Sequence, residues 1–111
     1  MTVTTTTPGA ERFFEMLEIL EAAEWARGGG IAVHRNFDVT GLRIGGRTRQ
    51  GSAYHVLGRM DLLLEWGHRN GQRPSWVQPG DDAGDFENLP HFDVFGGPAR
   101  RLEARLGVPA L

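Results

Sequence analysis

The clearest change of secondary structure in this sequence occurs in one stretch, GGGIAVHRNFDVT at residues 28–40. Three consecutive glycines end a helix, because glycine readily adopts the left-handed conformation that closes one. After them, apolar and polar side chains alternate over residues 31–40, which is the two-residue period of a half-buried strand. Arg35 falls on the apolar side, so it must reach solvent or pair with an acid. The stretch predicts a helix before residue 28 and a strand after residue 30.

The sequence before these glycines predicts an acidic amphipathic helix over Pro8–Arg27. Thr7 suits the N-cap position and Pro8 the first helical position. The apolar face of this helix holds Phe13, Met16, Leu17, Leu20 and Ala23. The opposite face holds Glu11, Glu15, Glu18, Glu21 and Glu24. Phe14 and Trp25 lie among the glutamates, so they are either contacts for a partner or covered by another part of the same chain.

The start of the chain, MTVTTTT at residues 1–7, is rich in β-branched residues. This composition fits either a disordered tail or a strand added to the edge of a sheet. The remaining residues, 8–111, have the length of a single domain. We therefore expect one domain, preceded by a short tail or edge strand.

After the predicted strand, the pair Gly45-Gly46 lies between two short flanking segments in Leu42–Arg49. Two such turn residues between short flanks indicate a β-hairpin. A central helix is predicted from Ser52 to Arg69, where Asn70 and Gly71 stop it. Its main apolar face holds Ala53, Val56, Leu57, Met60, Leu63, Leu64 and Gly67. A second stripe holds His55, Arg59, Leu62 and Trp66, so this helix is expected to be sandwiched within the domain or used at an interface.

Helical and strand periodicity both fail over residues 72–97, which contain prolines, glycines and acids. The apolar residues there do not suit a free tail, so we expect a long segment that wraps the core, with a short strand near His91–Phe95. Pro98 then begins a short terminal helix, Ala99–Leu106, which ends at Gly107. The predicted fold is α+β: an N-terminal helix, a β-hairpin or small antiparallel sheet, a central helix, and this wrapping segment with its terminal helix.

Charge is distributed in blocks along the chain, although the net charge is only −2. Residues 1–26 carry five acids and one arginine, and residues 27–59 carry six arginines and one aspartate. Residues 60–95 carry seven acids and two arginines, and residues 96–111 carry three arginines and one glutamate. All twelve basic residues are arginine, a composition that a GC-rich bacterial or phage genome favours. The basic block between two acidic ones therefore requires a partner in the same chain, in a second copy, or in another molecule.

Few residues in this sequence carry a recognisable catalytic or cofactor motif. There is no cysteine, no phosphate-binding glycine loop and no G-x-S-x-G element. The spacing nearest to an ion site is that of Asp85, Glu87, His91 and Asp93, which we interpret as a solvated acidic loop, and we predict no metal or cofactor. His34, Asp38 and His55 form the one acid–base set that the predicted elements allow to meet, although their spacing does not require it.

These observations give three functional hypotheses. The first is a non-enzymatic interaction module that associates with itself or with another protein. Its apolar anchors would be Phe14, Trp25, Leu62 and Trp66. The alternative is a nucleic-acid-binding protein whose hairpin and following helix present arginines to phosphates. Its contacts would be Arg43, Arg47, Arg49 and Arg59. The third is a small acid–base or metal-dependent enzyme.

Membrane insertion is not expected, because no apolar run approaches the roughly 18 residues that a spanning helix needs. The N-terminus also lacks the basic region and hydrophobic core of a signal peptide. We therefore expect a cytoplasmic protein.

Overall fold

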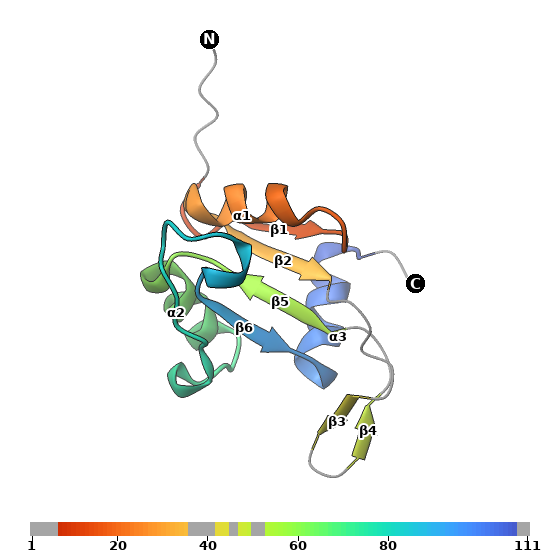
Figure 1. Ribbon diagram of the computed structural model, residues 1–111. Helices are drawn as coiled ribbons and strands as arrows, with labels where there is room; N and C mark the ends of the chain where they lie inside the picture. Colours follow the sequence, from red (N-terminus) through yellow and green to blue (C-terminus); the bar gives the residue numbers. More distant parts are fainter. Residues whose placement is uncertain (1–6, 36–41, 45–46, 50–52, 109–111) are drawn as a thin grey trace.

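A computed structural model describes residues 7–35 and 53–108 in full, together with the backbone of residues 42–44 and 47–49. In the order in which they lie side by side, the strands of the main sheet are β1 (Glu11–Phe14), β2 (Ile31–Arg35), β5 (Tyr54–Leu57) and β6 (His91–Val94) (Figure 1). β1 and β2 are parallel, whereas the other two pairs are antiparallel. The α+β class predicted from the sequence is confirmed.

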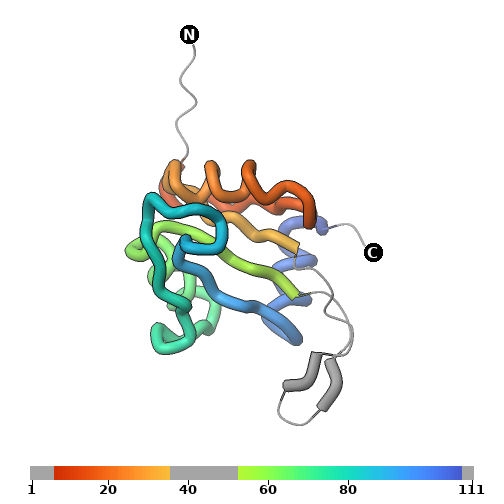
Figure 2. Tube along the Cα trace, viewed as in Figure 1, coloured from red at the N-terminus to blue at the C-terminus, as the bar shows by residue number. Residues whose placement is uncertain are grey.

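The sheet is covered on both faces. Helix α1 (Ile19–Arg27) connects the two parallel strands and lies on one face. Helices α2 (Met60–Arg69) and α3 (Gly96–Leu106) lie on the other. Figure 2 shows the segment between α2 and β6 crossing the sheet on the same side as α1. That segment contains two short 3₁₀ turns, η1 (Pro74–Trp76) and η2 (Phe86–Asn88).

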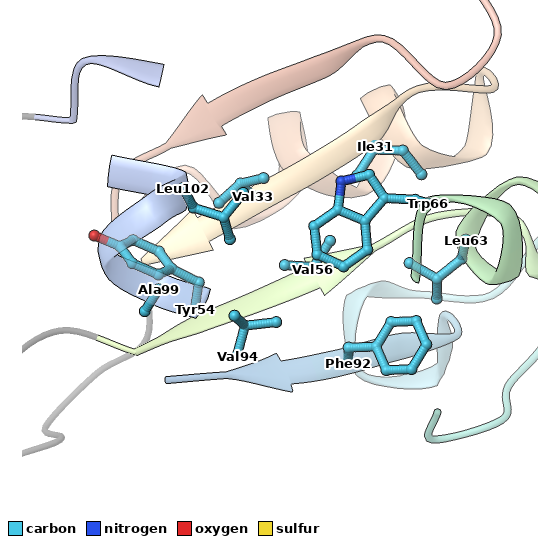
Figure 3. Close-up of a cluster of buried hydrophobic side chains, with 10 residues drawn as sticks. All are labelled: Ile31, Val33, Tyr54, Val56, Leu63, Trp66, Phe92, Val94, Ala99 and Leu102. Atoms are coloured by element: carbon cyan, nitrogen blue, oxygen red, sulfur yellow. The ribbon is translucent and has the colours of Figure 1, made fainter. Parts of the chain in front are cut away.

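The larger core lies between the sheet and the pair α2 and α3. Alternate residues of the three strands β2, β5 and β6 point into it, as the two-residue period of a strand requires. Its buried members are Ile31, Val33, Tyr54, Val56, Leu63, Trp66, Phe92, Val94, Ala99 and Leu102 (Figure 3). Trp66 packs against Phe92 with ring centroids 6.1 Å apart, and its Nε1 donates to Glu11 Oε2 over 2.7 Å.

The smaller core lies between the sheet and α1. Its buried members are Phe14, Ala22, Ala23, Ala26, Ala32, Leu57 and Leu89. Alanines on the buried side of α1 bring the helix close to the sheet, and Trp25 lies directly over Gly30. A Cβ at Gly30 would stand 2.2 Å from Trp25 Nε1, so only glycine allows this approach. The same Nε1 donates to Ala10 O over 2.9 Å.

The prediction of a helix from Pro8 to Arg27 is wrong for its first half. Residues 11–14 form β1, and α1 begins only at Ile19. Adjacent Phe13 and Phe14 point to opposite faces of the sheet, where Phe13 meets Tyr54 and Phe14 meets Trp25. A strand can bury two neighbouring aromatics in this way, whereas a helix would place both on nearby sides. Leu17 and Leu20, predicted to face the core, are 84% and 74% exposed.

The prediction of one helix over Ser52–Arg69 is also wrong at its start. Residues 54–57 form the strand β5, and α2 begins at Met60. Gly58 separates the two elements, and a Cβ there would stand 2.8 Å from Ile31 Cδ1. The apolar spacing that suggested a helix arises because both faces of β5 are covered.

Several other predicted elements are confirmed. The hairpin consists of β3 (Leu42–Ile44) and β4 (Arg47–Arg49), the short strand is β6, and the terminal helix ends at Gly107 with φ 64°. Arg35 is buried and donates from Nε to Glu15 Oε1 over 2.6 Å, so it pairs with an acid. The predicted tail, apart from Thr7, and residues 36–40 of the predicted strand lie outside the described residues. No helix in the described ranges is long and apolar enough to cross a membrane.

Candidate functional site

The register of the sheet places polar side chains in a row on the face that α1 partly covers. His34 of β2 pairs with His55 of β5, and His55 pairs in turn with Asp93 of β6. In the neighbouring row, Leu57 pairs with His91. Residues directly opposite each other on adjacent strands have side chains in contact range. The fold therefore brings three histidines and a carboxylate from three strands to one surface.

His55 and Asp93 form the centre of this cluster. His55 Nε2 lies 3.2 Å from Asp93 Oδ1, with the two side chains 27% and 45% exposed. The other carboxylate oxygen, Oδ2, accepts a hydrogen bond from Gln78 Nε2. The hydrogen bond with His55 lowers the pKa of Asp93, burial opposes this, and the nearby charges of His55 and His91 lower it further. Asp93 is thus held as a carboxylate that accepts from two side chains.

The carboxylate determines the tautomer of His55. An imidazole that points one nitrogen at an ionised carboxylate carries its proton on that nitrogen. Neutral His55 therefore has N–H at Nε2 and a lone pair at Nδ1. Nδ1 is the ring nitrogen that can take up a proton.

His91 stands beside His55, with ring centroids 5.4 Å apart at an interplanar angle of 72°. Its Nδ1 lies 3.0 Å from Leu89 O, and a carbonyl oxygen can only accept, so Nδ1 is the donor. The lone pair of neutral His91 is consequently at Nε2. The cluster offers two imidazoles, each held by a separate partner.

His34 differs from the other two histidines because it is only 2% exposed. Its Nε2 donates to Met16 O over 2.9 Å, and its Nδ1 has no hydrogen-bond partner in the described part of the chain. Burial lowers the pKa of His34, only partly opposed by the bond to Met16, so the ring is neutral at pH 7. The ring of Phe86 packs against the ring of His34 in a T-shaped arrangement, with the two ring centroids 4.8 Å apart. His34 is therefore a buried, neutral ring that packs against His55 and Phe86.

A pocket of about 220 Å³ opens beside these groups. Its lining consists of His55, Leu57, Phe86, Glu87 and His91. Two imidazoles and one carboxylate therefore face a space that also has an apolar floor and wall. No serine, cysteine or lysine lines it, and within residues 7–35 and 53–108 no group of three or more His, Cys, Asp or Glu side chains is placed to hold a metal ion.

The predicted acid–base set is partly reproduced. His34 and His55 do meet, although His55 comes from a strand and not from the predicted helix. Asp38 lies outside the described residues, and Asp93 is the carboxylate beside His55. The signal for Asp93 was present in the sequence, since His91 and Asp93 are two apart in a segment predicted as a strand and so share a face.

The four predicted interface anchors are placed differently from what we expected. Phe14 and Trp66 are each 1% exposed and belong to the two cores, so they are not surface anchors. Trp25 and Leu62 are half-buried and pack against those cores from their edges. A helical wheel places Phe14 among the glutamates. In the strand β1 it instead packs against Trp25 and the smaller core.

The predicted nucleic-acid contacts fall on β3, on β4 and at the start of α2. Arg43 lies on β3, Arg47 and Arg49 lie on β4, and the hairpin pairs them in the register Arg43 with Thr48 and Ile44 with Arg47. Arg59 is exposed and stands at the N-cap of α2. The side chains of the three hairpin arginines lie outside the described residues.

Comparison with protein families, with characterised proteins and with solved structures finds no match to this chain. The histidine cluster and the surfaces around it are therefore the features of the molecule that bear on its function.

Proposed function

We propose that this protein is a small proton-transfer catalyst whose working group is His55, oriented by Asp93. The observation that carries this proposal is the chain of contacts from Gln78 to Asp93 to His55 at the rim of a pocket. A histidine held by a carboxylate in this way is the usual arrangement of a general base, because the carboxylate fixes the tautomer and stabilises the imidazolium that forms.

The other lining groups support complementary roles. His91 stands close enough to His55 to act on the same small substrate, so neutral His55 would accept a proton at Nδ1 while His91, in its imidazolium form, would donate one from Nε2. Leu57 and Phe86 would hold an apolar part of the substrate and exclude water. Because no serine, cysteine or lysine lines the described part of the pocket, we assign to its imidazoles proton transfer from the substrate or from water.

The dimensions of the pocket restrict the substrate. Pockets for drug-sized ligands measure about 300–1,000 Å³, whereas this one measures about 220 Å³. Among the residues that the structure describes, no arginine lines the pocket to neutralise an anion, and Glu87 would repel one. The proposed substrate therefore presents a small neutral group, such as an ester or a carbon acid next to a carbonyl.

Hydrolysis of p-nitrophenyl acetate, a small neutral ester, tests this proposal. His55→Gln is expected to lower kcat/KM by about 100-fold, the usual contribution of a general base. Asp93→Asn should lower it by about 10-fold or more, because the tautomer is no longer fixed. His68→Gln is the matched control, since His68 is exposed on α2 and lies outside the pocket lining.

Circular dichroism would establish that the variants are folded. The proposal fails if the wild type hydrolyses the ester no faster than the same concentration of free imidazole, or if His55→Gln and His68→Gln have equal rates. A ¹⁵N NMR spectrum with the proton of neutral His55 on Nδ1 would contradict the role of Asp93.

A further inference from the structure

β6 is an edge strand of the main sheet, and within the described ranges much of its outer edge is unpaired. The one isolated bridge in the described residues joins His91 to Gln78, with Gln78 N donating to His91 O over 2.8 Å and His91 N donating to Gln78 O over 3.1 Å. Outward-facing backbone groups recur at every second residue of a strand. Those of Asp93 and Phe95 therefore point to the same side as those of His91. The edge beyond the bridge is a template for another strand.

An apolar groove of about 430 Å³ adjoins this part of the edge. Its lining consists of Gln72, Trp76, Asp93, Val94, Phe95 and Pro98. Trp76 is 53% exposed, with the guanidinium of Arg73 5.6 Å from its ring centroid. A large exposed aromatic beside an open strand edge is typical of an interaction site. We call Asp93, Val94 and Phe95, together with Trp76 and Pro98, the edge groove.

The two faces of the edge strand differ in what they would accept. Val94 belongs to the face that carries the larger core, whereas Asp93 belongs to the face with His55. An added strand would therefore place apolar side chains on the first face and a cationic side chain on the second. The strand that fits must alternate apolar, basic, apolar.

β3 has this alternation, since its three residues are Leu42, Arg43 and Ile44. It belongs to a two-stranded sheet, so one of its edges is unpaired within that sheet. Charge also matches at one position, because the middle residue of β3 is an arginine and the acid that lines the edge groove is Asp93. Opposite charges on facing strands favour encounter and fix register.

We propose that the protein forms a dimer in which β3 of each copy adds to β6 of the other. In this pairing, the sequence alternation of β3 matches its two apolar residues to the apolar face of β6 and its arginine to the face of Asp93. Each chain has one such hairpin and one edge groove, so two reciprocal contacts close a twofold-symmetric pair. The dimer joins the two main sheets through the two hairpins and covers both open edges.

Analytical ultracentrifugation of the full chain tests the dimer. The wild type is expected to have about twice the 12.3 kDa mass of the chain. Arg43→Glu and Trp76→Ala should each weaken association by about 10-fold or more. The matched controls are Arg69→Glu, an exposed arginine of α2, and Leu20→Ala, an exposed apolar residue of α1, and neither should change the mass.

Mixing the two variants distinguishes this pairing from any other dimer. The Arg43→Glu chain keeps an intact edge groove, and the Trp76→Ala chain keeps an intact β3, so an equimolar mixture restores one of the two contacts. The mixture should therefore associate more tightly than either variant alone. A wild type that is monomeric at its highest soluble concentration, a dimer that neither substitution weakens, or a mixture no tighter than its components would each overturn the proposal.

Discussion

Glu11 shows how much a single side chain contributes to this small domain. It stands on β1 and accepts from Trp66 of α2 and from Arg105 of α3, which also donates to Asn70. Burial alone would raise the pKa of Glu11, but the hydrogen bonds from Arg105 and Trp66 outweigh it and lower the pKa. One carboxylate thus connects three elements at the rim of the larger core.

The lowered pKa of Glu11 predicts a pH-dependent contribution to stability. A carboxyl whose pKa is lower in the folded state stabilises the protein above its unfolded pKa, and this stabilisation is lost as the pH falls through the folded pKa. Glu11→Gln should therefore lower the free energy of unfolding by about 1 kcal/mol at pH 7 and by much less at pH 3. Urea denaturation at both pH values measures the difference.

Glu24→Gln is the control for this experiment, because Glu24 is exposed on α1. An equal loss at pH 3 and pH 7 would mean that the shape of Glu11, and not its charge, is what stabilises the fold.

At the scale of the elements, the contact between α1 and β2 depends on one glycine. Gly30 lies under the ring of Trp25, which in turn covers Phe14. Gly30→Ala should destabilise the protein by about 1–3 kcal/mol, because the added methyl group displaces the indole from a packed site. In the Trp25→Ala background the same change should cost little, since the two effects share one cause.

Thermal or urea denaturation of the two single variants and the double variant measures this coupling. Gly97→Ala is the control, because a Cβ there meets nothing closer than Arg101 Nη1 at 3.5 Å. Additive effects of Gly30→Ala and Trp25→Ala would contradict the explanation.

The elements also show what could be predicted from the sequence. Helix ends marked by glycine, the hairpin and β6 follow from local rules, and each is confirmed. β1 and β5 were mistaken for helix because the spacing of their apolar residues matches both periods, and only the partners on the two faces decide between them. The position of Gly58 was a usable signal for the end of β5.

The candidate site was less predictable than the fold. The sequence allows His34 and His55 to lie close together. The row of His34, His55 and Asp93, however, depends on the register of three strands separated by long connections. Of the two buried anchors, Phe14 lies on a strand, so a helical wheel places it on the wrong side. Trp66 lies on a helix as predicted, and it is buried because α2 packs against the sheet. Local patterns determine which face a residue shares, and the pairing of distant strands determines its neighbours.

For the whole molecule, the hairpin of β3 and β4 is an insertion between the paired strands β2 and β5. The last register pair of these strands is Arg35 with Tyr54, so the segment between these two residues can be shortened without changing the main sheet. Replacement of residues 37–52 by Asn-Gly should leave the domain folded. Loop shortening of this size should raise the free energy of unfolding by about 1 kcal/mol.

Chemical denaturation and the NMR signals of His55 and His91 would check this shortened chain. The variant should keep ester hydrolysis and should lose the dimer, which separates the catalytic proposal from the proposal for association. Loss of the folded state would show that the hairpin is needed by the domain itself.

The ion pair between Glu11 and Arg105 joins residues 94 positions apart in the sequence. This separation affects when the domain can assemble during synthesis. β1, α1 and β2 are contiguous and can meet early, whereas β6 and α3 are synthesised after all the other described elements. Until then β5 lacks its outer neighbour, and Tyr54 and Val56 have no α3 to cover them. Completion of the sheet is therefore expected to be the late, slow step of folding.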